Sequence, residues 1–192
     1  QTLHGEINQG LVETINEFGG RATSIHGTSI FQATQLAGKN ESGEEVDIGQ
    51  VGQVHHCLTE KVLDALSSRL VPVVSPLGRH RETGKTHNIN ADLAAAALAC
   101  ALKPAKLVYL SDVPGLLSDP ADQSSLIESV TGDEARNLIA NGTISGGMIP
   151  KITSALEALE SGVEKVHFID GRMPHTLLLE IFTKSGIGTE IR

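Results

Sequence analysis

The sequence predicts an α/β fold in which a mostly parallel sheet lies between layers of helices. Short apolar runs typical of buried strands alternate along the chain with segments whose apolar residues recur at helical spacing. The alanine-rich run Ala91–Leu102 predicts a helix in the middle of the chain, closed by Pro104. We take Pro104 as the seam between two lobes, residues 1–103 and 104–192.

The composition limits both the core and the partners. Apolar residues make up 40% of the 192 residues, with no Trp, one Tyr and four Phe, so we expect an aliphatic, alanine-rich core. A net charge of −8 argues against nonspecific binding to nucleic acid or to an anionic membrane. Cys57 and Cys100 suit neither a disulfide framework nor a metal site. Because no apolar run is long enough to span a bilayer and no secretion signal is present, we expect a cytoplasmic protein.

The first lobe is expected to begin with a helix. Apolar residues recur at helical spacing from Ile7 to Phe18, and the pair Gly19-Gly20 ends the pattern. A strand at residues 22–25 and a polar loop at 40–45 are then expected. Val46, Ile48, Val51 and Val54 have strand-like spacing with Gly49 and Gly52 between them, which predicts a hairpin over residues 46–54. A helix at 62–70, a strand at 71–74 and a charged loop at 78–85 are expected to follow.

The second lobe is expected to continue the alternation. Thr131 and Glu134 have the spacing of a capping box, which predicts a helix over residues 133–140. The helix that contains Lys151 is expected to end at Gly162. Two strands and a last helix are expected at residues 106–110, 166–169 and 174–182.

The most informative segment for function is Gly146-Gly147-Met148-Ile149-Pro150-Lys151. The glycine pair is expected to open a helix and to place Lys151 in its first turns. Backbone N–H groups at a helix start and a nearby ammonium group together favour a phosphate. The alternative is a flexible glycine turn followed by a solvated lysine.

Polar residues also cluster in Asn88-Ile89-Asn90-Ala91-Asp92. Alternation along an extended segment places Asn88 and Asn90 on one side, where two amides can bind a carboxylate or an amide of a small substrate. Asp92 lies in the first turn of the following helix and can orient lysines. The ordinary alternative is an asparagine cap with a first-turn aspartate.

Two further turns follow predicted strands, where ligands of open α/β sheets bind. They are Ser111-Asp112-Val113-Pro114-Gly115, which can frame a base and ribose, and Asp170-Gly171-Arg172. Each is also an ordinary turn sequence, and Arg172 can either face a ligand or be a surface residue of its turn. Gly84-Lys85-Thr86 lacks the glycine spacing of a phosphate-binding P-loop, so we reject that assignment. The histidines show no metal-ligand spacing, so we expect no metal site made by protein ligands alone.

Taken in order, and with the last one extended to His167-Phe168-Ile169-Asp170-Gly171-Arg172, these four motifs resemble those of the N-acetylglutamate kinases, a branch of the amino-acid kinase family. The resemblance extends from about Glu6 to the C-terminus. It implies a three-layer α/β/α sandwich with a substrate-binding first lobe and a nucleotide-binding second lobe. It also implies transfer of the ATP γ-phosphate to the side-chain carboxylate of N-acetyl-L-glutamate, the second step of arginine biosynthesis through the acetylated route.

The resemblance implies a role for each motif. Asn88 and Asn90 would hold the acetylglutamate, Asp92 would orient the catalytic lysines, and Lys151 would stabilise the transferred phosphoryl group. Mg²⁺ would be carried by the nucleotide phosphates. The nucleotide pocket would be lined by Ser111, Asp112, Val113, Gly115, Gly147, Met148 and Ile149.

The chain also departs from the family pattern. The family's N-terminal strand, with a lysine and a glycine pair that cradle the phosphates, is absent. The next glycine pair and the arginine that binds the substrate are absent too. Gly19-Gly20 cannot replace either pair, because they end a helix rather than follow a strand. We therefore expect an N-terminally incomplete chain that is inactive alone. The segment from His26 to Phe31 is less polar than the family's glycine-rich turn and is assigned no role.

The ending from Leu177 to Thr189 resembles the arginine-inhibited branch of the family. Glu180, Gly186 and Gly188 would bind the guanidinium and backbone groups of arginine as an effector. The alternative is a C-terminal helix followed by a glycine turn. The family also implies a homo-oligomer for the intact protein.

Two other functions compete with this interpretation. One is a related kinase that acts on carbamate, aspartate, glutamate or a nucleoside monophosphate. The other is a non-catalytic module that senses arginine or a nucleotide.

Overall fold

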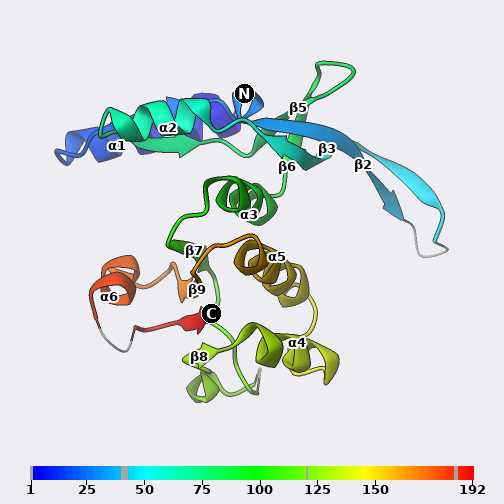
Figure 1. The fold of residues 1–192 in the computed structure, drawn as a ribbon, viewed down its shortest axis with the longest axis vertical. Helices are drawn as coiled ribbons and strands as arrows, with labels where there is room; N and C mark the ends of the chain where they lie inside the picture. The colour runs from blue at the N-terminus through cyan, green and yellow to red at the C-terminus, as the bar shows by residue number, and fades with distance from the viewer. Residues whose placement is uncertain (1, 40–42, 120, 184–185) are drawn as a thin grey trace. The chain divides into compact units, whose positions relative to one another are not determined.

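The structure is a computed structural model that describes residues 2–39, 43–119, 121–183 and 186–192 (Figure 1). The chain divides into two compact units, Gln1–Leu98 and Ala99–Arg192. This boundary lies inside helix α3 (Ala91–Leu102), whose bounds are those expected. The seam at Pro104 and the division of substrate and nucleotide binding between two lobes stay predictions.

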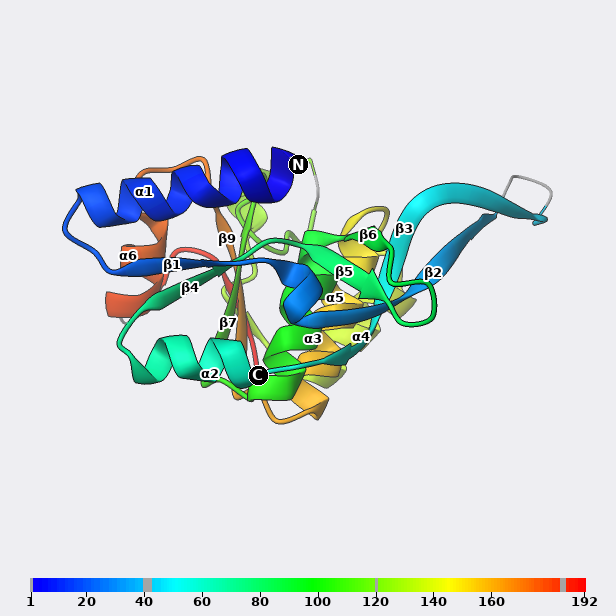
Figure 2. The same cartoon turned by 90° about the horizontal axis from the view of Figure 1, so that it is seen from above.

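The first unit is built around a small parallel sheet. Strands β1 (Ala22–Ile25) and β4 (Val71–Val74) pair in parallel, with the bounds that the sequence predicts. Helix α1 (Gln9–Glu17), preceded by a π-helical segment (Thr2–Asn8), and helix α2 (Glu60–Ser67) lie on opposite faces of this pair (Figure 2). The layers in this unit are therefore helix, sheet and helix.

The end of α1 shows why the glycine pair is needed. Gly19 has φ of +81°, a left-handed conformation that glycine adopts without strain. The N–H of Gly20 then donates to the carbonyl oxygen of Ile15 at 2.8 Å. The predicted helix and its glycine stop are confirmed.

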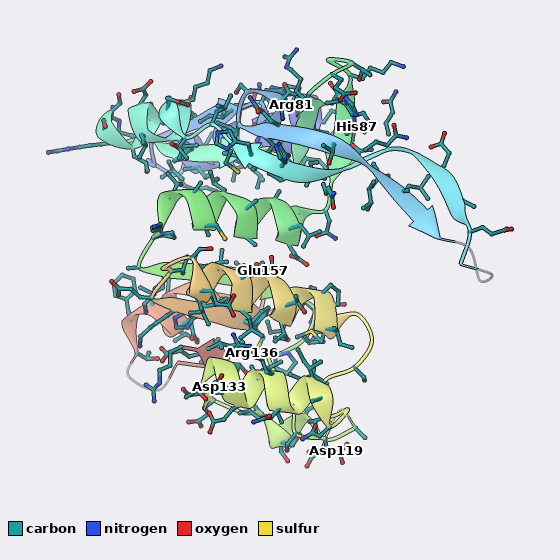
Figure 3. All side chains as sticks on the ribbon, turned by 45° about the vertical axis from the view of Figure 1, so that its right-hand side comes forward. Arg81, His87, Asp119, Asp133, Arg136 and Glu157 are labelled. Atoms are coloured by element: carbon teal, nitrogen blue, oxygen red, sulfur yellow. The ribbon has the colours of Figure 1, made fainter. Side chains whose placement is uncertain are left out.

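Four further strands of this unit form a closed barrel. They are β2 (Phe31–Lys39), β3 (Glu45–Cys57), β5 (Leu77–His80) and β6 (Thr86–Ile89), joined in the order β2-β3-β6-β5. Strands β2 and β3 are antiparallel, as are β5 and β6. Arg81 and His87 lie on the β5–β6 hairpin (Figure 3).

The strands of this barrel differ from the sequence-based expectations in two places. Residues 46–54 do not form a hairpin of their own, because they lie within the single strand β3. Gly52 is not a turn residue there: a Cβ at that position would lie 3.0 Å from the Thr34 carbonyl oxygen of β2. The charged loop expected at 78–85 is shorter, since residues 77–80 form β5. Of the loop expected at 40–45, residues 40–42 lie outside the described residues.

The second unit contains a four-stranded sheet in the order β7-β9-β10-β8. Strands β7 (Lys106–Ser111) and β9 (Lys165–Asp170) are parallel along their whole length. Strand β10 (Thr189–Ile191) is antiparallel to β9, and β8 (Ser129–Val130) pairs with β10 in parallel. Strands β8 and β10 are too short to show a period-two pattern, and the sequence did not predict them.

Three helices cover this sheet or extend from it. Helices α5 (Met148–Glu160) and α6 (Thr176–Phe182) lie on opposite faces of β7 and β9 (Figures 1 and 2). Helix α4 (Gly132–Ala140) begins with the predicted capping box. Arg136 of α4 pairs with Asp133 at 2.8 Å and with Glu160 of α5; Figure 3 labels Asp133 and Arg136. These layers confirm the three-layer α/β/α architecture.

Aromatic residues lie at the centre of the second unit although the chain has few of them. The rings of Tyr109 and Phe168 stack with centroids 4.9 Å apart, which joins β7 to β9. The Tyr109 hydroxyl lies 3.2 Å from Ser154 Oγ, so it connects the same strands to α5.

Within the described residues, no helix is long and apolar enough to cross a membrane.

The capping box of α4 is expected to contribute measurably to stability. The Thr131 side chain accepts a hydrogen bond from the Glu134 N–H, and the Glu134 carboxylate accepts one from the Thr131 N–H. Thr131→Ala should lower the free energy of unfolding in urea by about 1 kcal/mol. Thr14→Ala, at an exposed position inside α1, is the matched control and should change it by less. Equal unfolding midpoints for Thr131→Ala and the unaltered protein would contradict this role.

Candidate active site

The glycine pair opens helix α5 as the sequence predicts. Gly146 has φ of +57°, and Gly147 is the residue that precedes the first helical residue, Met148. Both glycines are exposed, and a Cβ on either would meet no atom within 4 Å. The left-handed conformation therefore favours glycine at position 146, whereas Gly147 leaves the helix start open to a ligand. A helix start of this kind carries positive partial charge.

Lys151 connects this helix start to the end of a strand. Its side chain is half-buried, and Nζ donates a hydrogen bond to Ser111 Oγ at 3.2 Å. Ser111 is the last residue of β7, and its Oγ lies 3.3 Å from Asp112 Oδ1. The alternative of a fully solvated lysine is therefore wrong, because the ammonium group is directed to the carboxyl end of the sheet.

The turn Asp170-Gly171-Arg172 packs against the same strand end. The Gly171 N–H donates to the Ser111 carbonyl oxygen at 2.8 Å. A Cβ at Gly171 would lie 3.2 Å from Leu110 Cβ, so a side chain would strain this contact. The turn and Ser111 therefore hold each other in place.

A charged pair stabilises this turn. The Arg172 guanidinium donates to Asp170 through Nε at 2.9 Å and through NH2 at 2.7 Å. Hydrogen bonds from the Arg172 side chain, and then from its backbone N–H, lower the pKa of Asp170 to about 2. Of the two alternatives for Arg172, the structure shows a largely exposed arginine that binds its own turn.

An apolar pocket of about 170 Å³ lies beside the α5 start. Three residues expected at the nucleotide line it: Val113, Gly115 and Met148. Sequence reasoning missed Leu116, Leu117, Thr143, Ile144 and Ser145. Of these, Leu116 and Ile144 are buried, so their apolar character in a loop was the available signal. The other expected residues, Ser111, Asp112, Gly147 and Ile149, lie at the strand end and the helix start.

The amides expected at the substrate lie in the first unit and differ from each other. Asn88 is exposed on β6 and lines a pocket of about 530 Å³. Asn90 instead caps α3, because its Oδ1 accepts hydrogen bonds from the N–H groups of Asp92 at 2.9 Å and Leu93 at 3.2 Å. The cap that we considered as the ordinary alternative is thus present at Asn90. The substrate role of both amides and the role of Asp92, half-buried in the first turn of α3, stay predictions.

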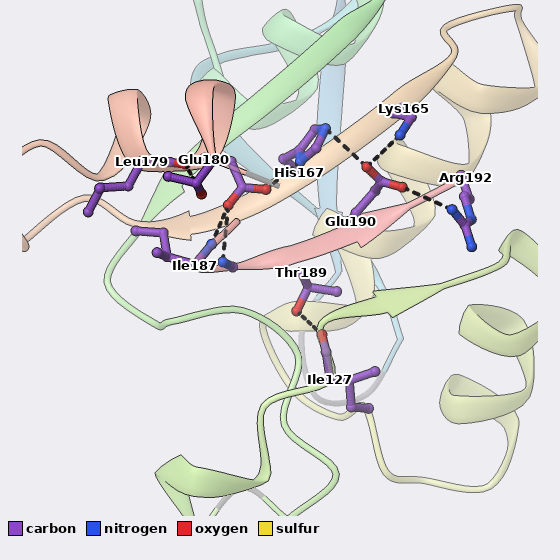
Figure 4. A network of polar contacts seen from close by, with 11 residues as sticks. Ile127, Lys165, His167, Leu179, Glu180, Ile187, Thr189, Glu190 and Arg192 are labelled. Atoms are coloured by element: carbon purple, nitrogen blue, oxygen red, sulfur yellow. Dashed lines mark hydrogen bonds and ion pairs between the residues drawn. The ribbon is translucent and has the colours of Figure 1, made fainter. Parts of the chain in front are cut away.

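Glu180 organises the C-terminal segment of the second unit (Figure 4). Its Oε2 accepts hydrogen bonds from the N–H groups of Ile187 at 2.8 Å and Gly188 at 3.1 Å. Burial acts to raise the pKa of Glu180, but hydrogen bonds from Ile187, His167 and Gly188 outweigh it, and the pKa is lowered. Gly188 is a packing residue, since a Cβ there would lie 2.1 Å from the Phe168 carbonyl oxygen.

Glu180 and Gly186 also line a polar pocket of about 420 Å³. His167 lies in its wall, with Nδ1 2.6 Å from Glu180 Oε1 (Figure 4). Its Nε2 is buried and has no hydrogen-bond partner among the described residues, with Glu190 Oε2 3.9 Å away. A buried nitrogen without a partner is costly, so this atom marks a position where a ligand can bind. The sequence motifs assign His167 no binding role and do not indicate Lys165, Glu190 and Arg192, which line the same pocket.

Comparison with known proteins identifies the family. The model of the amino acid kinase family matches residues 1–170, so the chain belongs to this family. The chain is similar to the acetylglutamate kinase of Akkermansia muciniphila, with 59% identity over 191 residues. That match covers 100% of this chain and 64% of the relative. The chain therefore spans less than two thirds of the length of this curated relative.

Solved structures give the same fold. The chain is similar to N-acetylglutamate synthase from Neisseria gonorrhoeae complexed with coenzyme A and N-acetyl-glutamate, with a TM-score of 0.77 and 28% identity over 96% of this chain and 42% of that chain. It is also similar to that synthase complexed with coenzyme A and L-arginine, with a TM-score of 0.75 and 26% identity over 98% and 46% of the two chains.

The Asp170–Arg172 pair should make stability depend on acidity. Because the folded-state pKa of Asp170 is about 2 and its ordinary value is 3.8, the pair contributes stability above pH 4 and loses it as the pH falls toward 2. Arg172→Met should therefore lower the melting temperature at pH 7, and the difference from the unaltered protein should shrink with acidification.

Arg21→Met, at an exposed position, serves as the control, with melting followed by circular dichroism. A difference between Arg172→Met and the unaltered protein that stays constant from pH 7 to pH 2 would contradict this assignment.

Proposed function

We propose that the whole protein transfers the γ-phosphate of ATP to the side-chain carboxylate of N-acetyl-L-glutamate, the second step of arginine biosynthesis through the acetylated route. The observation that carries the proposal is the Lys151–Ser111 contact at the mouth of α5, beside an apolar pocket. The 59% identity to a protein named acetylglutamate kinase supports it. Neither the other kinases nor the non-catalytic sensor is favoured by these relatives.

The chemistry needs charge neutralisation rather than a base. The attacking carboxylate is already ionised at neutral pH, so no proton has to be removed. Two anions must instead be brought together, and catalysis of phosphoryl transfer depends on positioning and on electrostatic stabilisation. The Lys151 ammonium and the N–H groups at the start of α5 supply positive charge where negative charge accumulates.

The residues present suit ATP. The apolar walls of Val113, Leu116 and Met148 are suited to an adenine ring, and the open glycine pair at residues 146 and 147 is suited to phosphates. Within the described residues, no three His, Cys, Asp or Glu side chains gather as a metal site. We propose that Mg²⁺ is held by the nucleotide phosphates, whose oxygens are ligands that it prefers, and adds to charge neutralisation there.

The same proposal assigns the remaining expected residues. Asn88, and Asn90 through its amide N–H groups, would hold the acetylglutamate, and Asp92 would orient the catalytic lysines. A homo-oligomer of the intact protein and a cytoplasmic location belong to this proposal and stay predictions.

The activity test uses a chimera. The 192 residues are joined to the parts of the Akkermansia muciniphila relative that lie outside the matched region, and acyl phosphate is trapped with hydroxylamine. We expect hydroxamate to form only with both ATP and N-acetyl-L-glutamate, and Lys151→Ala to lower turnover by roughly 100- to 1,000-fold. Lys61→Ala, exposed on α2, is the control.

A chimera that folds but makes no acetylglutamate-dependent hydroxamate would refute the proposed activity. Near-normal turnover by Lys151→Ala would refute the role of the ammonium group. The 192-residue chain assayed alone tests the expectation that it is inactive without the family's lysine and glycine pair.

We also propose that the pocket beside Glu180 binds arginine as a feedback effector. The His167 Nδ1 is paired with Glu180, so the lone pair of the buried Nε2, which has no partner among the described residues, can accept a hydrogen bond from a guanidinium group. Glu190 and Gly186 line the same pocket, and the similar synthase was solved with L-arginine. These observations favour an effector site over the alternative of a purely structural glycine turn.

Glu190→Gln tests the effector pocket because it removes a negative charge and keeps the shape of the side chain. We expect L-arginine to bind the 192-residue chain in calorimetry, and the variant to bind at least about tenfold more weakly. Glu164→Gln, at an exposed position, is the control. Equal affinity of Glu190→Gln and the control, or no heat of binding with the unaltered chain, would contradict an arginine site here.

A further inference from the structure

A histidine pair lines the pocket that contains Asn88, and the proposed function assigns it no role. The pocket measures about 530 Å³ and is lined by His4, His26, Gln50, Thr86 and Asn88, among others. His26 directly follows strand β1, and Ser75 directly follows the parallel strand β4. Ligands of open α/β sheets bind beyond such carboxyl ends.

The backbone fixes His26 in this position. The N–H of Gly27 donates to Ser75 Oγ at 3.0 Å. A Cβ at Gly27 would lie 2.0 Å from the Ser75 carbonyl oxygen and 2.4 Å from that of Leu77. Only glycine permits this approach, so the turn that carries His26 lies directly on the chain segment that follows β4.

Local hydrogen bonds define the tautomer of His26. Its Nδ1 accepts from the Thr28 N–H at 3.3 Å and lies 2.8 Å from Thr28 Oγ1. An accepting Nδ1 carries no proton, so in the neutral ring the proton is on Nε2. Burial, followed by the nearby His4 and Arg79, lowers the pKa of His26, which keeps the ring neutral at pH 7.

His4 is arranged in a similar way. Its ring centroid lies 4.2 Å from that of His26, and its Nδ1 lies 3.5 Å from Ser75 Oγ. Because Ser75 Oγ accepts from the Gly27 N–H, its own hydrogen is available to His4 Nδ1. This leaves Nε2–H as the remaining donor of His4. Among the described residues, neither Nε2 has a hydrogen-bond partner.

We propose that this pocket is the subsite for a carboxylate of the acidic substrate, and that His4 and His26 bind that carboxylate through their Nε2–H groups. The amides of Gln50 and Asn88 and the hydroxyl of Thr86 add further neutral donors to the same wall. Neutral donors suit a carboxylate with a single charge better than a phosphate, for which proteins supply arginine, lysine or a helix start. The identity of the substrate, N-acetyl-L-glutamate, rests on the proposed function.

Imidazole nitrogen spectra of the ¹⁵N-labelled 192-residue chain test the proposal. Without ligand, we expect both Nδ1 atoms to be unprotonated. On titration with N-acetyl-L-glutamate, the Nε2 resonances of His4 and His26 should shift together and saturate at the same concentration.

His26→Asn provides the matched variant. The asparagine Oδ1 can replace Nδ1 as the acceptor for the Thr28 N–H, so the turn is expected to fold while the Nε2–H donor is lost. We expect N-acetyl-L-glutamate to bind roughly 10- to 100-fold more weakly, as for loss of a hydrogen bond to a charged group. His56→Asn, exposed on β3 and outside the pocket, should bind as the unaltered chain does.

The outcomes separate this proposal from the proposed function. If N-acetyl-L-glutamate binds but leaves both imidazoles and the affinity of His26→Asn unchanged, the histidine subsite is wrong and the proposed substrate stands. If L-glutamate or N-acetyl-L-aspartate shifts both rings and N-acetyl-L-glutamate does not, the subsite stands and the proposed substrate is wrong. If none of the three shifts either ring, the subsite is overturned.

Discussion

The hydrogen bond between Lys151 and Ser111 joins the start of a helix to the carboxyl end of a strand. It keeps an ammonium group, which would otherwise extend into water, at the place where α5 already presents positive partial charge. The Asp170-Gly171-Arg172 turn holds Ser111 from the other side through the Gly171 N–H. A phosphate at the helix start would therefore meet a charge that is already positioned, which is what phosphoryl transfer requires of a protein.

The same physical rule operates in both units. In each, a parallel strand pair is followed by a glycine against which the neighbouring chain packs closely. A Cβ at Gly27, after β1, would clash with backbone atoms, and a Cβ at Gly171, after β9, would make a tight contact with Leu110. Close backbone approach at these turns fixes the polar groups beside them. Parallel sheets covered by helices leave only these strand ends accessible, so the candidate functional groups collect there.

Residues close in sequence predicted most of the helices and strands, but they did not predict which strands pair when those strands are far apart in the chain. The bounds of β1, β4 and α3 and the capping box of α4 follow from residues close in sequence. The closed barrel was not predicted, because Gly52 was interpreted as part of a turn. In the structure, Gly52 instead allows close contact with β2. At the candidate site, motifs indicated Lys151 and Asn88, and the roles proposed for them stay predictions. No motif indicates the proposed histidine pair, because its arrangement depends on three segments far apart in the chain.

Direct observation of the Lys151 ammonium group tests, without relying on turnover, whether this group meets the phosphates of the nucleotide. Its Nζ resonance in the ¹⁵N-labelled 192-residue chain is followed while the Mg²⁺ complex of a non-hydrolysable ATP analogue is added. We predict that the Lys151 signal shifts to saturation, while that of the exposed Lys61 stays in place. If the analogue binds and the Lys151 signal does not move, the ammonium group does not meet the phosphates, and the assignment of this site to phosphoryl transfer is contradicted.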